Sequence, residues 1–390
     1  MRILVLAFLA LLTTNLYAND IETAIQSAPS NVQEFYKAHN NLVWVDGNQL
    51  NELGVYAKKT LENAAHEGLN PADYAEGISA LSNLSNPAHS DVVFTKVFFK
   101  YIDDVRNGRF DPKEASSKIK LRPETANPVE LITAGLKEGG THWIDELPPQ
   151  QPQYIKLKKA LNTHTDHHEQ IITTMERWRW MPRFLGERYV IVNIPHFWLK
   201  AFEHDHEIMT SPIIDGRASS QTPVFPGEIY EIIFRPEWHV PASIVPEIKD
   251  RSRFYETENG GLVQPAGPKN ALGLIRFSVN VMGTDSNPYN VYLHSTGSKG
   301  LFKNEVRDLS HGCVRVEKVV DLAKFVFNDP KWTEEKIQNS MDNGGTKHVK
   351  LPSKVPVYIS YFTVWVNDDG SLDTAKDVYH QDQKVESVIG

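Results

Sequence analysis

The chain is poor in cysteine, in positive charge and in long hydrophobic runs. Cys313 is the only cysteine in 390 residues, which excludes intramolecular disulfides and zinc sites built from several thiolates. The 41 Lys and Arg stand against 49 Asp and Glu, and this net charge of −8 disfavours a nucleic-acid-binding protein. Internal repeats and low-complexity tracts are also missing. The fold must therefore be held by hydrophobic cores, and the length suits two domains.

The one long apolar run lies at the N-terminus, from Ile3 to Leu12. Arg2 precedes it and Ala18 supplies a small residue for cleavage, so residues 1–18 are predicted to be a secretory signal peptide. The run is shorter than the roughly 20 apolar residues that a membrane-spanning helix needs. If it stayed uncleaved, it would act as an anchor. Otherwise we expect an exported protein with no membrane span after removal of the signal.

Residues 19–182 are predicted to form a helical scaffold domain. Apolar side chains recur at helical spacing in three segments, residues 50–64, 91–110 and 127–140. Gly68 and Gly108 are placed to end the first two helices, and two glycines end the third. These helices show no chemistry of their own, so a scaffold is the simplest interpretation.

Residues 183–366 are predicted to form a mainly antiparallel β domain, which makes the whole chain α+β. Their β-branched and aromatic runs are bounded by Gly, Pro and Asn, and one helix is predicted over residues 317–327. Residues 240–270 are irregular; a loop of that length in a compact domain is most often functional, so we predict a lid. Asp369-Gly370 predicts a hairpin turn within residues 367–390, the hairpin end and C-terminal tail.

A lone cysteine in an exported protein has several explanations. It can pair with a second chain, serve as a small buried hydrophobe, sense oxidants, or act as a nucleophile. A sensor usually has a resolving cysteine nearby, and this chain has none. A nucleophile must ionise, which a helix N-terminus and a nearby histidine promote. The helix predicted near Glu317 and the imidazoles of His294 and His311 offer both, and Gly312 permits a turn that exposes the sulfur.

Two other histidine-rich stretches raise the question of metal binding. His164 and His168 would share a helix face, but no third ligand accompanies them. Residues 203–207 lie between two predicted strands. We interpret the first stretch as a solvated linker and the second as a polar turn. We therefore expect no metal site, and nothing in the sequence implies a cofactor.

The residues around Cys313 resemble the signature of the L,D-transpeptidases of bacterial cell walls. In that family a histidine and a spacer precede Ser or Thr followed by His-Gly-Cys. Here His294 and fifteen intervening residues precede Ser310-His311-Gly312-Cys313. Six other stretches resemble the larger Gram-negative members: MERWRWMP (175–182), VNIPHFWL (192–199), TPVFPGEI (222–229), WHVPASIVPEI (238–248), GPKNALGLIRF (267–277) and YFTVWVNDDG (361–370). With the helical half, the resemblance covers nearly the whole mature chain.

Two departures from the family pattern are visible. Longer members insert a peptidoglycan-binding module just before the MERWRW stretch, where this chain has only a short polar segment. Smaller members place Asn two residues after the cysteine, whereas Arg315 stands here, as in the larger subgroup. An arginine can bind a substrate carboxylate through two hydrogen bonds. A structural ion pair with an acidic neighbour is the alternative for Arg315.

The resemblance implies a role for each residue of the signature. Cys313 would be the nucleophile and His294 its general base, with the main-chain carbonyl of Ser295 orienting the His294 ring. His311 would shape the site, and Gly312 would contribute to the oxyanion hole.

Three further residues are expected to contact substrate, namely Arg315, Ser310 and Tyr292.

The implied reaction is acyl transfer on peptidoglycan tetrapeptide stems, which serve as donor and as acceptor. Release of the terminal D-alanine would be followed by a cross-link between two diaminopimelate residues. Carbapenems would acylate the same sulfur, and the expected location is the periplasm of a Gram-negative bacterium, with the protein a monomer. The alternatives are L,D-carboxypeptidase, endopeptidase or lipoprotein-anchoring activity on the same stem, and a non-catalytic wall-binding protein.

Overall fold

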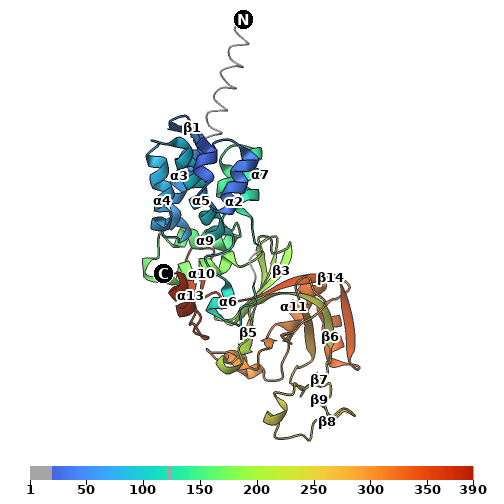
Figure 1. The fold of residues 1–390 in the computed structure, drawn as a ribbon. Coiled ribbons are helices and arrows are strands. Elements are labelled where there is room, and N and C mark those ends of the chain that lie inside the picture. The colour runs from blue at the N-terminus through green and yellow to red at the C-terminus, as the bar shows by residue number, and fades with distance from the viewer. Residues whose placement is uncertain (1–19, 122–124, 390) are drawn as a thin grey trace.

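The computed structural model describes residues 20–121 and 125–389, so the predicted signal peptide of residues 1–18 lies outside the described part. A bundle of helices forms the N-terminal half, and a β-rich half follows, with a small sheet projecting from its far end (Figure 1). In the described ranges, none of the helices has both the length and the apolar character needed to cross a membrane. This arrangement confirms the predicted α+β class.

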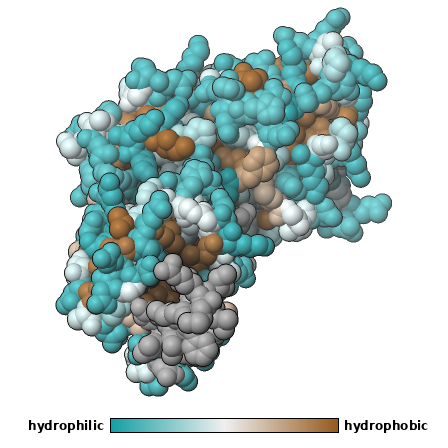
Figure 2. All heavy atoms as spheres, turned by 90° about the horizontal axis from the view of Figure 1, so that it is seen from above, coloured by the Kyte–Doolittle hydropathy of each residue, from teal (hydrophilic) through white to brown (hydrophobic). Residues whose placement is uncertain are grey.

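The N-terminal half consists of helices joined by short turns. They are α2 (Ser30–His39), α3 (Glu52–Glu62), α4 (Ala75–Ser82), α5 (Pro87–Arg106), α6 (Pro112–Ala115), α7 (Pro128–Glu138), α8 (His142–Asp145), α9 (Pro152–Ala160) and α10 (His168–Arg179). Single turns of 3-10 helix, η1 (Ala64–Glu67), η2 (Pro71–Tyr74) and η3 (Thr165–His167), and a small hairpin, β1 (Val45–Asp46) with β2 (Gln49–Leu50), complete it. Apolar side chains point inward, and the surface seen from above is mainly hydrophilic (Figure 2).

Helix α5 is the centre of this bundle. It begins at Pro87, where Asn86 caps it by accepting a hydrogen bond from the His89 N–H at 3.1 Å. Most of its residues are buried, because α2, α3, α4 and α7 pack around it, and one stripe that includes Lys96 and Lys100 stays open to solvent. The three helices predicted from the sequence therefore exist, as α3, α5 and α7.

The described residues form two hydrophobic cores, and from Tyr154 onward every core residue belongs to that of the β-rich half, which also takes in Ala115, Ile119 and Leu121. We predicted the end of the scaffold at residue 182. Helices α9 and α10 nevertheless pack on the β-rich half: Trp178 of α10 stacks on Phe362, with ring centroids 4.7 Å apart. These two helices therefore fasten the scaffold to the sheet.

A nine-stranded sheet forms the β-rich half. Its strands are β3 (Arg188–Asn193), β4 (Trp198–Glu203), β5 (His206–Gly216), β6 (Phe225–Phe234), β10 (Ile275–Val281), β11 (Leu293–His294), β12 (Asp308–Ser310), β13 (Val314–Val316) and β14 (Lys347–Ser360). The strand order is β12-β5-β13-β11-β10-β6-β14-β3-β4, and β4 also pairs with β5, so the sheet closes on itself. Six of the nine pairings are antiparallel and three are parallel, which confirms a mainly antiparallel sheet.

The predicted lid is more regular than the sequence indicated. Strands β7 (Trp238–His239), β8 (Tyr255–Glu256) and β9 (Leu262–Gln264) form a separate sheet, with the 3-10 turn η5 (Val245–Glu247) between them. Figure 1 shows this sheet projecting from the end of the main one. Strands of two or three residues are too short to show an alternating pattern, which is why sequence analysis assigned a loop.

The helix predicted over residues 317–327 is α11 (Val319–Phe327), and two more helices follow that were not predicted, α12 (Glu334–Asp342) and α13 (Asp382–Ile389). The hairpin turn at Asp369-Gly370 joins β15 (Val364–Val366) to β16 (Leu372–Thr374), as expected. The segment that follows this hairpin packs against the rest of the protein. Helix α13 packs on α10 and α6, and Asp382 pairs with Arg177, so the C-terminal end returns to the scaffold (Figure 1).

Candidate active site

Two adjacent parallel strands place the predicted site residues on one face. In β11 and β13, Leu293 pairs with Val314, and both side chains are fully buried in the core. Side chains alternate between the two faces of a strand. The residues on either side of this pair, Tyr292 with His294 and Cys313 with Arg315, therefore share the opposite face.

The turn that carries the thiol is fixed by hydrogen bonds. Ser310 Oγ donates to the carbonyl of Cys313 at 2.6 Å and accepts from the Gly312 N–H at 3.0 Å. Gly312 has φ 117°, a conformation that side chains disfavour, so glycine is required here by the backbone. The oxyanion-hole role predicted for Gly312 requires its N–H to be shared with, or released from, Ser310.

A second loop supports this turn from outside. Thr222 Oγ1 donates to the carbonyl of Gly312 at 2.8 Å and accepts from the Gly216 N–H at 2.9 Å. The hydroxyl of Tyr379, from the C-terminal segment, donates to the Gly216 carbonyl. Ser220 Oγ donates to the carbonyl of His311 at 2.9 Å. The support that these residues give to the turn could not be predicted from the sequence, because it depends on chain segments that meet only in the fold.

Cys313 is half-buried, and its Sγ donates to the carbonyl of Asn290 at 3.4 Å. Burial raises the pKa of the thiol, while hydrogen bonds from Tyr292 and the charges of Arg276 and Arg315 lower it. Because burial is the largest effect, the resting thiol is neutral. It therefore needs a base when it attacks.

The helix N-terminus predicted beside the sulfur is not there. Residues 314–316 form β13 instead, which pairs with β11 and β5, and α11 begins only at Val319. The β-branched Val314 and Val316 favour a strand, and both are buried in the sheet. That prediction was wrong, and the α11 dipole does not activate Cys313.

His294 is held in one orientation and one tautomer. Its Nδ1 lies 2.6 Å from the carbonyl of Ser295. A carbonyl oxygen only accepts, so Nδ1 carries the proton and Nε2 is left as a base. Ser295 is itself anchored, because its Oγ accepts from the N–H groups of Leu274 at 2.7 Å and Ile275 at 3.1 Å.

The environment keeps the His294 ring neutral. The ring is buried, with 4% of the residue exposed. Burial, followed by the positive charge of Arg315, lowers its pKa to about 4, and Arg276 adds to the effect. An imidazole that is neutral at pH 7 can accept the proton of a neutral thiol.

This lowered pKa predicts an unusual pH profile. The rate of Cys313 acylation should hold from neutral pH down to about pH 5 and fall with a midpoint near 4, where His294 takes up a proton. Since the unfolded chain binds this proton first, stability should also decrease as the pH falls from about 6.5 toward 4. Measuring the rate of Cys313 acylation at a series of pH values across this range gives the midpoint. A midpoint near 6.5 would contradict the buried, neutral imidazole.

His311 connects the turn to the lid. Its Nε2 lies 2.8 Å from Glu247 Oε2, and Arg217 donates to the other carboxylate oxygen at 3.0 Å. Glu247 belongs to η5, between the lid strands. The hydrogen bond with His311 is the main reason that the pKa of Glu247 is lowered. His311 thus links the turn to the lid segment, and its role in shaping the site stays a prediction.

Comparisons with known proteins bear on both halves of the chain. Residues 30–161 match the family model of a scaffold domain, and residues 187–349 match that of the L,D-transpeptidase catalytic domain. Residues 187–349 are thus similar in sequence to an L,D-transpeptidase catalytic domain. A Haemophilus influenzae protein, provisionally described as an L,D-transpeptidase, is 26% identical over 277 residues, which is 63% of this chain and 54% of that protein. The chain thus spans about half the length of this curated relative.

Solved structures with partial likeness include L,D-transpeptidases. An L,D-transpeptidase from Mycobacterium smegmatis has a TM-score of 0.26 and 13% identity, covering 45% of this chain and 58% of that one. Bdellovibrio bacteriovorus Bd1075 has a TM-score of 0.24 and 14% identity, covering 51% of this chain and 54% of that one.

One charged residue of the candidate site was not predicted from the sequence. Arg276 of β10 is the cross-strand partner of His294, and its guanidinium carbon lies 4.7 Å from the centre of the Tyr292 ring. A signal existed: Arg276 stands between the buried Ile275 and Phe277, so it must point to the other face of a central strand. Which residues it meets there depends on strand pairing, which the sequence does not show.

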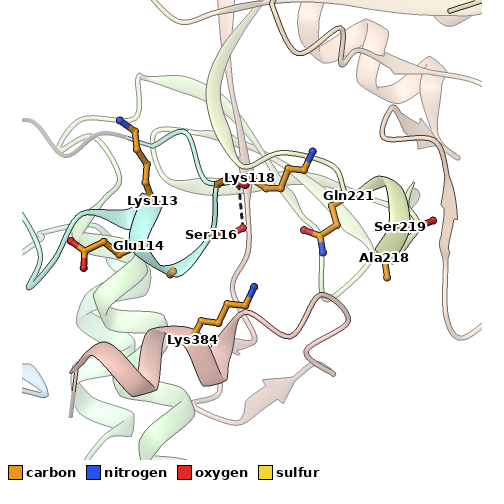
Figure 3. Close-up of a pocket in the computed structure, with 10 residues that line it drawn as sticks. Lys113, Glu114, Ser116, Lys118, Ala218, Ser219, Gln221 and Lys384 are labelled. Atoms are coloured by element: carbon orange, nitrogen blue, oxygen red, sulfur yellow. Dashed lines mark hydrogen bonds between the residues drawn. The ribbon is translucent and has the colours of Figure 1, made fainter. Parts of the chain in front are cut away.

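A separate hollow of about 440 Å³ lies where α6, α13 and the turn η4 (Ala218–Ser220) meet. Figure 3 shows Lys113, Lys118 and Lys384 extending from its walls. Tyr292, His294, Cys313 and Arg315 do not line this hollow, so it is separate from the candidate active site. In the described ranges, no three His, Cys, Asp or Glu side chains are grouped closely enough to hold a metal ion.

Proposed function

We propose that this protein cross-links peptidoglycan stem peptides between two diaminopimelate residues, with Cys313 as the nucleophile. One observation supports the proposal most: a neutral His294, held by the Ser295 carbonyl, shares a strand face with the neutral thiol of Cys313. These two groups have the protonation states that general-base activation of a thiol requires. The catalytic-domain family is consistent with this chemistry.

The first step is acylation of Cys313. Its proton passes to Nε2 of His294 while Sγ attacks the carbonyl carbon of the L-centre of diaminopimelate in a tetrapeptide stem. The bond to the terminal D-alanine then breaks, and the departing amine takes the proton from His294. The products are a thioester on Cys313 and free D-alanine.

The second step transfers the acyl group to an amine. The side-chain amine of a second stem attacks the thioester, gives a proton to His294, and Cys313 recovers its thiol. The lid favours an amine over water, because the contact of Glu247 in η5 with His311 keeps this part of the lid beside the catalytic turn. A shielded thioester reacts more slowly with bulk water.

Product analysis separates this proposal from its alternatives. We expect the purified protein, incubated with tetrapeptide muropeptides, to release D-alanine and form dimers joined between two third residues, as seen by mass spectrometry. A free tripeptide without dimers would mean carboxypeptidase activity, and cleavage of existing dimers would mean endopeptidase activity. Transfer to a lipoprotein lysine alone would mean an anchoring enzyme. An unchanged substrate would favour a non-catalytic wall-binding protein.

The same chemistry extends the proposal to inhibitors and to location. Carbapenems present a strained acyl group that the Cys313 thiol can attack, so we propose that they inactivate the protein. The predicted signal peptide, together with a peptidoglycan substrate, leads us to propose the periplasm of a Gram-negative bacterium. Both statements follow from the proposed reaction.

A further inference from the structure

Two arginines flank the catalytic imidazole across three neighbouring strands. Arg276 of β10 pairs with His294 of β11, and His294 pairs in turn with Arg315 of β13. Both arginines are half-buried, and the Nε of each is buried without a hydrogen-bond partner. Among the ion pairs formed by the described residues, none involves either guanidinium.

An unpaired cation in a half-buried position is costly unless a ligand supplies the missing anion. The nearby carboxylate of Glu231 does not supply it. Glu231 lies 3.4 Å from Ser278 Oγ and 3.2 Å from Nδ1 of His348, while the Arg276 guanidinium donates to the hydroxyl of Ser278 at 3.2 Å. The two arginines are therefore placed to bind carboxylates that arrive with substrate.

Arg276 is directed toward the reacting atoms. Its guanidinium lies over the Tyr292 ring, 4.7 Å from the ring centre, and Tyr292 neighbours the thiol of Cys313. Its charge contributes to lowering the pKa of both His294 and Cys313, which supports the same placement. The hydrogen bond to Ser278, two residues further on the same strand, holds the side chain along β10.

The second step of the proposed reaction brings an amine to this position. Since His294 accepts the proton of the attacking amine, the amine must lie beside the imidazole. In the D-centre of diaminopimelate, the amine and a carboxylate share one carbon. That carboxylate then lies within a few ångströms of the amine, about the spacing between neighbouring strands, which is roughly 4.8 Å.

We propose that Arg276 binds the carboxylate beside the attacking amine, and so selects acceptors in which an amine and a carboxylate share one carbon. This inference rests on the proposed transpeptidase function. Arg276 acts as a specificity residue for the acceptor, and Arg315, two residues beyond Cys313 on its strand, is left for the donor stem. A lysine side chain, whose amine has no neighbouring carboxylate, is a poor acceptor.

The test uses a donor that cannot accept and acceptors that cannot donate. The donor is a tetrapeptide whose side-chain amine is acetylated; the acceptors are two tripeptides, ending in meso-diaminopimelate or in L-lysine. We expect the parent protein to favour the diaminopimelate acceptor at least about tenfold, the range of one charged hydrogen bond. In Arg276→Gln the diaminopimelate rate should fall about tenfold and the lysine rate should stay unchanged, so that the preference disappears.

Three controls make the outcome decisive. Carbapenem acylation involves no acceptor, so in Arg276→Gln its rate should fall less than the rate of transfer to diaminopimelate, which separates acceptor binding from loss of the fold or of the nucleophile. Arg276→Lys should keep part of the preference, because a charge remains. Arg253→Gln, an exposed arginine of the lid, removes the same charge elsewhere and should change nothing.

Each failure has a distinct meaning. Dimer formation by Arg276→Gln with the preference intact overturns the role of Arg276. Equal losses of carbapenem acylation and of both acceptor rates also overturn it, in favour of a general role of Arg276 at the site. If the parent protein is acylated but joins neither acceptor, the proposed cross-linking function itself is wrong.

Discussion

Replacing Cys313 with alanine is expected to abolish dimer formation and D-alanine release, by about 10⁴-fold or more, while the protein stays folded. No other thiol can take over the role of the nucleophile, because the chain has no other cysteine. The side chain is only half-buried, and its polar contacts are the 3.4 Å interaction with the Asn290 carbonyl and the hydrogen bonds from Tyr292. Its removal should therefore change the free energy of unfolding by no more than about 1.5 kcal/mol. Muropeptide turnover and thermal unfolding, measured on the same preparation, test both statements.

Two results would contradict the assignment of Cys313 as the nucleophile. Residual turnover of Cys313→Ala at a tenth of the parent rate would place the reacting group elsewhere. A loss of several kcal/mol of stability would indicate that the thiol is a core-filling side chain. Cys313→Ser is the matched control, since it keeps the shape and the hydrogen bond to Asn290 and should still lack activity.

Replacing His294 with alanine is expected to slow acylation of Cys313 by about 10²- to 10⁴-fold, the usual contribution of a general base. The reason lies in the resting protonation states: burial raises the pKa of the thiol, so the sulfur does not ionise without a base. The rate of carbapenem adduct formation measures this step directly. The slowed variant should recover at high pH, because hydroxide then ionises the thiol.

The buried position of His294 requires a second variant. Only 4% of His294 is exposed, so its replacement by alanine leaves a buried cavity. A loss of stability can therefore accompany the loss of rate. His294→Gln fills more of that space and offers no base of comparable strength. Acylation of both folded variants at the parent rate would show that His294 is not the base.

The elements of the scaffold were predictable because local patterns encode them. Helices α3, α5 and α7 carry apolar residues at helical spacing with glycine or asparagine at their ends. The site residues His294 and Cys313 were also indicated by sequence, since their residue types and spacing are linear features. Their roles in the reaction remain predictions until variants are measured.

The arrangement of the site could not be predicted in the same way. Arg276 faces His294 because of the register between β10 and β11, and Thr222 supports Gly312 because two distant loops meet. The expected helix N-terminus at Cys313 failed because three residues of strand, paired with β5 and β11, intervene. Strand pairing is a long-range property, so one sequence gives residue types without their neighbours.

The same reason applies to the C-terminal segment. Its hairpin turn has a local signal, but the return of α13 to α10 depends on the pairing of Asp382 with Arg177, about half the chain away in sequence. The hydroxyl of Tyr379 then reaches the Gly216 carbonyl beneath the catalytic turn. A segment that sequence analysis treated as a tail thus supports the active site.

The proposed function requires a thiol that a stem peptide can reach and that one imidazole can deprotonate. Mass spectrometry of the intact protein after exposure to a carbapenem measures this most directly. We expect one adduct per chain, located by digestion on the peptide that contains Cys313, and none on Cys313→Ala. An unmodified protein after prolonged incubation, or an adduct on another peptide, would contradict it.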